Sequence, residues 1–268
     1  NRLQMSDFYK AKNEDEKLDI MFRAVYPTQT YFEDSWLRWS YYGGLCTPHY
    51  ENVKKYSKYK NKQGVVLDVN SLYPYVMSSR LLPYGKGNYS IHPYESMNDT
   101  YKKQFPLYTQ EITIGYLEVK PDKMAWLQLK ENLYFQPREI IKSNVVNGKR
   151  VEIKLTLTNV LLDLLFECYE VDGYKLGGHM AFRGSYGLFS NYLEYWSMVK
   201  QNSTGAKRAI SKLLQNSLYG KMGMSCDNEI TNFESKDGKF SINHTGETYI
   251  SSAIYLPLAT YITSYAKD

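Results

Sequence analysis

Cysteine and histidine are scarce in this chain of 268 residues, which contains three cysteines and four histidines. The cysteines, Cys46, Cys168 and Cys226, lie far apart and form none of the paired spacings that are typical of zinc sites. They also do not suggest the disulfide framework of a small secreted protein, so a reducing, cytoplasmic environment is indicated.

Long apolar runs are missing as well. The longest, Val160 to Phe166, is interrupted by Asp163 and is far shorter than the ~20 residues that a membrane-spanning helix requires. The N-terminal residues show no apolar core of a secretory signal. We therefore expect no membrane partner.

Tyrosine, by contrast, is abundant, with 27 residues. Its ring suits stacking on nucleic acid, but it suits a sheet-rich core equally well, and AT-rich coding DNA would also raise the count. The net charge of +5 is a weak indication of a polyanionic partner. Hydrophobic residues make up 43%, enough for the core of one large domain or two modest ones.

The pattern of residues predicts a mixed α+β fold. Residues 1–40 are predicted to be irregular or helical, and Gly64 to Asp68 to form a buried strand. Ser71 is placed to cap a short helix that ends near Arg80. The next stretch, residues 86–180, contains two strand-like segments, Ile112 to Val119 and Val151 to Leu157, and a helical period over Thr158 to Tyr169.

The second half of the chain predicts two hairpins. Leu188 to Gln201 and Gly205 to Leu218 are expected to be antiparallel helices joined by a short polar turn. Residues 225–250 are expected to form a β-hairpin, and the apolar segment Ala253 to Tyr265 to be helical beyond Pro257.

A single carboxylate, Asp68, stands where the predicted strand runs into a turn. Such an aspartate is most often a turn former, but it can also present an oxygen ligand to Mg²⁺ or Mn²⁺, and the carbonyl of Val69 can help. Tyr73 follows five residues later, where its ring is placed either for ordinary packing or to form a floor beneath a nucleotide sugar.

Polar side chains form one stripe on the second predicted helix of the helical hairpin. Arg208, Lys212, Asn216 and Tyr219 fall within an arc of ~80° at 100° per residue. The apolar residues of this helix would then face the core; they are Ala206, Ala209, Ile210, Leu213 and Leu214. An isolated stripe of this kind is typical of a solvated face, whereas together with the Asp68 segment it predicts a site for a metal-bound triphosphate.

Lysines alternate with tyrosines over residues 54–62. This pattern is typical of a surface that follows a phosphate backbone, and it is equally typical of a solvated hairpin tip.

Two segments, Asp68-Val69-Asn70-Ser71-Leu72-Tyr73-Pro74 and Lys212-Leu213-Leu214-Gln215-Asn216-Ser217-Leu218-Tyr219-Gly220, resemble signature motifs of the family B DNA polymerases, in that family's order. The long spacing between them is similar to that of the protein-primed subgroup found in bacteriophages and linear plasmids. Tyr41-Tyr42-Gly43-Gly44 resembles the motif between the exonuclease and polymerase domains, and Gly187-Leu188-Phe189 resembles the entry to the fingers.

This resemblance implies a role for each matching residue. Asp68 would be the catalytic carboxylate, and Asp68 and Val69 would be ligands of Mg²⁺ or Mn²⁺. The nucleotide would be bound by Ser71, Leu72, Tyr73 (as a steric gate against ribose), Lys200, Arg208, Lys212, Asn216 and Tyr219. DNA would be contacted by Tyr41, Gly43, Gly44, Ser185, Gly187, Gly220, Lys221, Thr263 and Lys267, the last replacing an arginine that would offer a bidentate fork.

The resemblance also implies a domain organisation. Residues 1–85 would be the first part of the palm, 86–183 an inserted region that contacts a terminal protein, and 184–224 the fingers. Residues 225–250 would be a second insertion and 251–268 a truncated continuation of the palm. The implied partners are template-primer DNA, deoxynucleoside triphosphates and a terminal protein that primes synthesis, in the host cytoplasm for a phage protein.

The sequence lacks the second catalytic motif of that family, an Asp-Thr-Asp type of turn, and shows no exonuclease or thumb segment. We therefore expect a fragment of a polymerase that does not extend primers alone. The alternatives are a non-catalytic replication accessory that binds nucleic acid, and a scaffold that binds a terminal protein through residues 86–180. An Asp-x-Asp turn encoded downstream would favour the enzyme.

Overall fold

The computed structural model describes residues 5–44, 65, 67–69, 71–136, 139–224, 227–236, 239–248 and 254–268. The lysine-rich segment 54–62 lies outside the described residues, as do Asn70 and the ends of the predicted β-hairpin segment. In the part of the chain that is described, no helix is long and apolar enough to cross a membrane.

Three helices open the chain: α1 (Met5–Lys10), α2 (Glu14–Val25) and α3 (Tyr31–Ser40). Asn13 caps α2 by accepting a hydrogen bond from the backbone N–H of Glu16. Thr30 and Glu33 form a capping box at the start of α3, in which each side chain accepts a hydrogen bond from the other residue's backbone N–H. The helical alternative for residues 1–40 is therefore confirmed for the described part.

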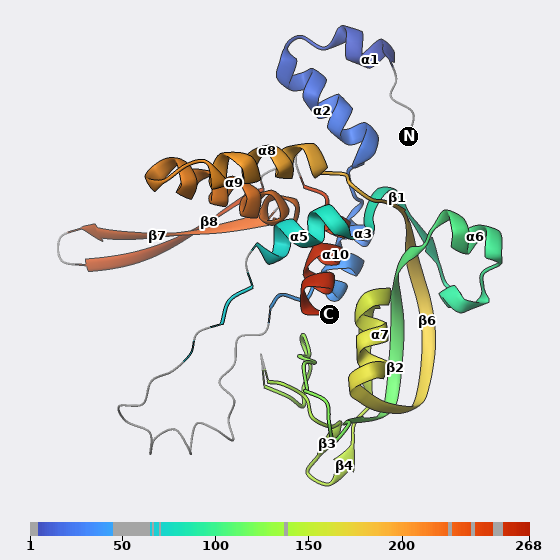
Figure 1. Ribbon diagram of the computed structural model, residues 1–268. Coiled ribbons are helices and arrows are strands. Elements are labelled where there is room, and N and C mark those ends of the chain that lie inside the picture. Colours follow the sequence, from blue (N-terminus) through green and yellow to red (C-terminus); the bar gives the residue numbers. More distant parts are fainter. Residues whose placement is uncertain are drawn as a thin grey trace.

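A four-stranded antiparallel sheet forms the centre of the fold, with the strand order β1-β6-β2-β5. Its strands are β1 (Leu82–Ser90), β2 (Leu107–Val119), β5 (Ile153–Thr158) and β6 (Tyr169–Ser185). β6 pairs with β2 along most of its length and with β1 over its second half, from Leu82 opposite Ser185 to Ser90 opposite His179. α7 (Asn159–Cys168) packs on this sheet beside β2 (Figure 1).

Smaller elements fill the connections between the strands. They are η1 (Tyr94–Ser96) and α6 (Asp99–Gln104) between β1 and β2, and the two-residue strands β3 (Val145–Val146) and β4 (Lys149–Arg150) before β5.

Two hydrophobic cores lie in contact with this sheet. The first surrounds α10 (Leu256–Lys267), in which every residue from Leu256 to Ser264 is buried. A helix that is buried all round must be largely apolar, as its sequence is. The second core lies between the sheet, α7 and the 126–141 segment, with Ile112, Leu117 and Leu161 fully buried.

The two predicted hairpins are confirmed. α8 (Ser190–Gln201) and α9 (Gly205–Met222) pack side by side, close to α5 (Leu72–Ser79) (Figure 1). β7 (Asp227–Lys236) and β8 (Lys239–Thr248) form a two-stranded ribbon that projects away from the rest of the molecule. The helix predicted beyond Pro257 is also present, as α10.

Two local predictions are wrong. The described residues of the predicted strand 64–68 are irregular and exposed, with 85% of Val65 and 89% of Leu67 accessible. On α9, the apolar residues do not face a core, since Ile210 and Leu213 are 54% and 64% exposed while Ser211 and Gln215 are buried. α9 packs against α8 through the side that carries Gln215, and Ile210 and Leu213 therefore lie on the exposed side of the helix.

The short strands β3 and β4 were not predicted, and neither were two strands of the central sheet. β1 reads Leu-Pro-Tyr-Gly-Lys-Gly and therefore looks like a turn, yet it pairs with β6. The boundary predicted between the palm segment 1–85 and the inserted region 86–183 falls inside this strand. β6 contains four glycines, which conceal the alternation that marks a strand.

Candidate functional site

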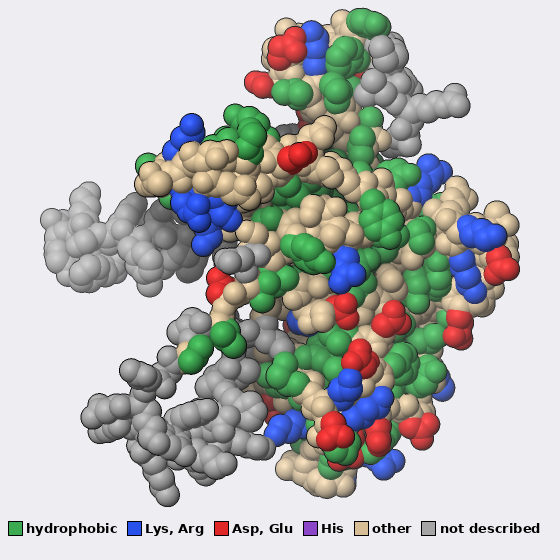
Figure 2. Space-filling model, viewed as in Figure 1, with side chains coloured by type: hydrophobic (Ala, Val, Ile, Leu, Met, Phe, Trp, Pro, Cys, Tyr) green, Lys and Arg blue, Asp and Glu red, His purple; other side chains and the backbone are tan. Residues whose placement is uncertain are grey.

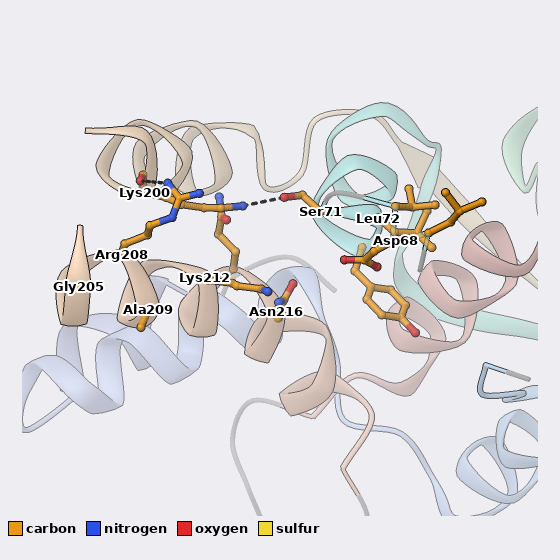
Figure 3. A pocket seen from close by; sticks show the side chains of 13 residues that line it. Asp68, Ser71, Leu72, Lys200, Gly205, Arg208, Ala209, Lys212 and Asn216 are labelled. Atoms are coloured by element: carbon orange, nitrogen blue, oxygen red, sulfur yellow. Dashed lines mark hydrogen bonds between the residues drawn. The ribbon is translucent and has the colours of Figure 1, made fainter. Parts of the chain in front are cut away.

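A cavity of about 1000 Å³ lies between the residues that precede α5 and the two helices of the helical hairpin. Figure 3 shows its lining side chains, which come from segments far apart in the sequence. The first wall is lined by Leu67, Asp68, Val69, Ser71, Leu72 and Tyr73, and the second by Lys200, Gly205, Arg208, Ala209, Lys212, Gln215 and Asn216. The two sequence segments that were expected to form one site therefore do face the same cavity.

Asp68 contributes a carboxylate to the first wall of this cavity. It is exposed, as are the flanking Leu67 and Val69, and the backbone there is irregular. Figure 3 places Asp68 across the cavity from Arg208 and Lys212. In the described part of the chain, no three histidine, cysteine, aspartate or glutamate residues cluster as a metal site would require.

Ser71 joins the two walls of the cavity. It precedes α5 in a left-handed conformation (φ 56°), and its side chain makes no capping hydrogen bond, so the predicted cap is wrong. Its hydroxyl oxygen instead accepts a hydrogen bond from Lys200 Nζ on α8, at 2.8 Å (Figure 3). The hydroxyl is therefore turned into the cavity rather than toward the helix.

Three cations stand on the second wall. Arg208 Nη1 donates a hydrogen bond of 2.9 Å to the carbonyl of Lys200, which brings α8 and α9 together at this point (Figure 3). Lys212 lies one turn further along α9 and points into the same space. Figure 2 shows lysine and arginine side chains gathered along this edge of α8 and α9. Only Asp68 offers the cavity a carboxylate among its described lining residues, so the site attracts anions.

Tyr73 lines the cavity at the start of α5, and its ring is in contact with a second aromatic ring. Tyr73 and Tyr219 stack with ring centroids 4.1 Å apart and planes inclined by 24°. Burial raises the pKa of Tyr219 to about 12, with smaller contributions from the Tyr73 hydroxyl and the charge interaction with Tyr41. Its phenol is thus neutral at physiological pH and can donate a hydrogen bond.

The residues expected to contact DNA do not line this cavity, and they differ in exposure. Gly43, Gly44, Gly187, Gly220 and Lys221 are exposed. Tyr41 and Ser185 are half-buried. Thr263 is buried inside α10, where its hydroxyl donates to backbone carbonyls of the preceding turn.

Lys267 lies beside a lysine that the sequence did not single out. Lys267 and Lys130 place their ammonium groups 5.4 Å and 4.8 Å from the centre of the buried Tyr42 ring. Lys130 Nζ also donates hydrogen bonds to the carbonyls of Arg38 and Tyr41, where α3 ends. Burial lowers the pKa of each lysine to about 8. No local signal marks Lys130, because its partners precede it by about 90 residues.

The chain belongs to the DNA polymerases of type B from organelles and viruses. The model of that family matches residues 5–268. The DNA polymerase of Bacillus phage Nf is 34% identical over 258 residues, covering 92% of this chain and 41% of that protein. The DNA polymerase of Bacillus phage phi29 is 30% identical over 252 residues, covering 92% of this chain and 40% of that protein.

Solved structures of phi29 DNA polymerase are similar in fold. In the complex with primer-template DNA and incoming nucleotide substrates, that chain is 29% identical and superposes with a TM-score of 0.75 over 97% of the present chain. The match covers 42% of the phi29 chain. The present chain thus spans about two fifths of the length of these relatives.

Proposed function

We propose that this chain carries the nucleotide-binding part of a template-directed DNA polymerase that performs two-metal, protein-primed nucleotidyl transfer. The observation that carries the proposal is the convergence of Asp68, Lys200, Arg208 and Lys212 on one cavity. Supporting it, the chain belongs to a polymerase family, and a relative of similar fold was solved with DNA and incoming nucleotides.

The three cations are proposed to hold the triphosphate of the incoming deoxynucleotide. Ammonium and guanidinium groups that are fixed before the substrate arrives stabilise the charge that develops on phosphate oxygens during transfer. Lys200 and Arg208 are held by hydrogen bonds to Ser71 and to the α8 backbone, respectively, so both helices contribute a fixed charge. Ser71 and Leu72 would contact the same phosphates from the other wall.

Asp68 is proposed as the catalytic carboxylate and, with the carbonyl of Val69, as a metal ligand. Both donors are oxygens, which Mg²⁺ and Mn²⁺ prefer, and the exposed, irregular backbone leaves them accessible. A divalent ion held there by Asp68 and Val69 would supply positive charge to the triphosphate oxygens and would lower the pKa of the attacking hydroxyl. These two oxygens would be this chain's donors to the ion.

Tyr73, Asn216 and Tyr219 are proposed to shape the pocket for the base and the sugar. The Tyr73 ring lies against Tyr219, so a nucleotide that enters must settle on a rigid aromatic surface. A hydroxyl at the 2′ position would then meet the Tyr73 ring, which favours deoxynucleotides.

The proposed macromolecular partners are template-primer DNA and a terminal protein. DNA would be contacted by Tyr41, Gly43, Gly44, Ser185, Gly187, Gly220, Lys221, Thr263 and Lys267. We propose that residues 1–85 and 251–268 belong to the palm and 184–224 to the fingers, that residues 86–183 contact the terminal protein, and that 225–250 form a second insertion.

Substitution of Lys212 tests this proposal. In a polymerase of the family's full length that contains this chain, Lys212→Ala should reduce kcat/KM for deoxynucleotides by ~2–4 kcal/mol in transition-state terms. Lys200→Ala and Arg208→Ala should be milder. Lys207→Ala is the matched control, because Lys207 is exposed on the same helix and does not line the cavity. Wild-type incorporation by Lys212→Ala would refute the assignment.

A further inference from the structure

The buried side of α9 includes two polar residues. α9 buries Ser211, Gln215 and Met222, whereas its apolar residues Ile210 and Leu213 are more than half exposed. Apolar side chains tolerate sliding of one helix along another, because their attraction has no direction. Apolar burial is provided by Leu193 of α8 and Met222 of α9, and a directional contact is needed in addition to fix the relative position of the two helices.

The amide of Gln215 provides such a specific contact. It is 1% exposed, and its Nε2 donates to Ser197 Oγ at 2.6 Å and to the carbonyl of Leu193 at 3.4 Å. A shift of α9 by one residue, ~1.5 Å, would leave this buried amide without partners. An unpaired buried polar group costs ~1–3 kcal/mol, so one register of the two helices is favoured.

The polar contact lies one helical turn from the cations of the cavity. Ser197 precedes Lys200 by three residues on α8, and Gln215 follows Lys212 by three residues on α9, so both pairs lie on neighbouring faces. α8 is in turn tied to the first wall by the bond between Lys200 and Ser71. The register of the two helices thus determines how far apart the charges on α8 and α9 stand.

We propose that Gln215 is a positioning residue, whose buried amide fixes α8 against α9 so that Lys200, Arg208 and Lys212 converge on one triphosphate. This inference rests on the proposed function of the cavity. Gln215 lines the cavity but is only 1% exposed, so its role is through the helix register and not through binding of the nucleotide. A buried polar group of this kind specifies one arrangement and contributes little net stability.

The test uses Gln215→Met, which keeps the length of the side chain and removes the amide. In a full-length polymerase containing this chain, KM for deoxynucleotides should rise ~5–10-fold while kcat changes less than about twofold, and Tm should shift by only a few degrees. Ser197→Ala should raise KM similarly. The double variant should be no worse than either single variant, because both remove the same contact.

Two outcomes of these kinetics would overturn the inference. An unchanged KM in Gln215→Met would show that the charges converge without the amide. A rise in KM that accompanies a large fall in Tm, or that adds up in the double variant, would make Gln215 a packing residue. The exposed Ser217→Ala on the same helix is the control and should alter neither quantity.

A nucleotide-free measurement separates this inference from the proposed function. In the chain 1–268 alone, Gln215→Met should accelerate hydrogen exchange of the α8 and α9 amides, with the exchange of α10 unchanged. If Lys212→Ala left nucleotide use intact while exchange accelerated, the proposed function would fail and the register role would stand. Unchanged exchange in α8 and α9 would refute the register role by itself.

Discussion

Two lysine side chains, those of Lys130 and Lys267, are largely buried. Lys130, in an irregular segment, and Lys267, in α10, both approach the buried Tyr42 ring, and Lys267 also lies over the ring of Trp126. The aromatic faces and the carbonyls at the end of α3 offer partial compensation for lost hydration. Each lysine nonetheless has a pKa lowered by burial to about 8, so both titrate near the upper end of the physiological range.

The titration of Lys130 predicts how stability varies with pH. Its folded pKa of about 8 is below the unfolded value of 10.5, so between these values the unfolded state binds more protons. The free energy of unfolding should therefore rise with pH in this window. The free energy of unfolding of the wild type minus that of Lys130→Met should therefore increase by on the order of 2 kcal/mol from pH 7 to 9.5.

Urea denaturation of both proteins across this pH range measures the effect. The exposed Lys149→Met on β4 is the control, for which the difference should stay flat. A flat difference for Lys130→Met would show that Lys130 keeps its charge throughout.

The contact between Tyr73 and Tyr219 predicts how the sugar is selected. In a full-length polymerase, Tyr73→Val should raise the use of ribonucleotides while deoxynucleotide use falls less, because the exclusion is steric. The ratio of kcat/KM for the two substrates is the measurement. Tyr75→Val, on the same helix but exposed, should leave that ratio unchanged. Undiminished rejection of ribonucleotides would make Tyr73 a packing residue.

At the scale of the secondary-structure element, the sequence predicted helices better than strands. α7, α8, α9 and α10 follow runs whose period or polar turn is visible locally. β1 and β6 are rich in glycine and exist because β6 pairs with both β1 and β2, which is a long-range effect. The exposed segment before α5 shows the converse, since apolar residues such as Val65 and Leu67 alone do not make a strand.

The capping box of α3 predicts a local contribution to stability. Thr30→Ala removes the hydroxyl that accepts from the backbone N–H of Glu33 and leaves a largely buried carboxylate with fewer partners. The free energy of unfolding should fall by ~1 kcal/mol, the usual cost of losing an N-cap. Chemical denaturation measures it, with the exposed Thr28→Ala as the control. Equal stability of the two variants would show that Glu33 caps the helix unaided.

At the scale of the whole molecule, the sequence predicted those residues of the candidate site that belong to short motifs. Asp68, Lys212 and Asn216 could be assigned to one site from two segments, and they line one cavity. Contacts that depend on three-dimensional packing were not predictable. The bond from Lys200 to Ser71, the Lys130 contacts and the buried side of α9 all join residues whose proximity only the fold creates.

The charge of the whole chain predicts how it binds nucleic acid. With a net charge of +5 and with exposed lysines and an arginine on α9, the chain 1–268 should bind DNA weakly and without sequence preference. Affinity should fall steeply with salt, because each phosphate contact releases a counterion. Fluorescence anisotropy at several salt concentrations measures the slope. Binding that is indifferent to salt, or absent at low salt, would contradict a DNA-facing surface.

The pairing of β1 with β6 has a consequence for how such a protein can be remodelled. Ser90 and His179 face each other across these two strands, so the chain departs from and returns to nearly the same point. The intervening segment brings almost all of the second core with it, and of its described residues only Leu107 and Val160 belong to the first. The remainder of the fold is still tied to this stretch by the hydrogen bonds of Lys130 with the carbonyls of Arg38 and Tyr41 and of Tyr261 with the carbonyl of Tyr108. A segment grafted at this junction would therefore have to reproduce those contacts as well as its own core.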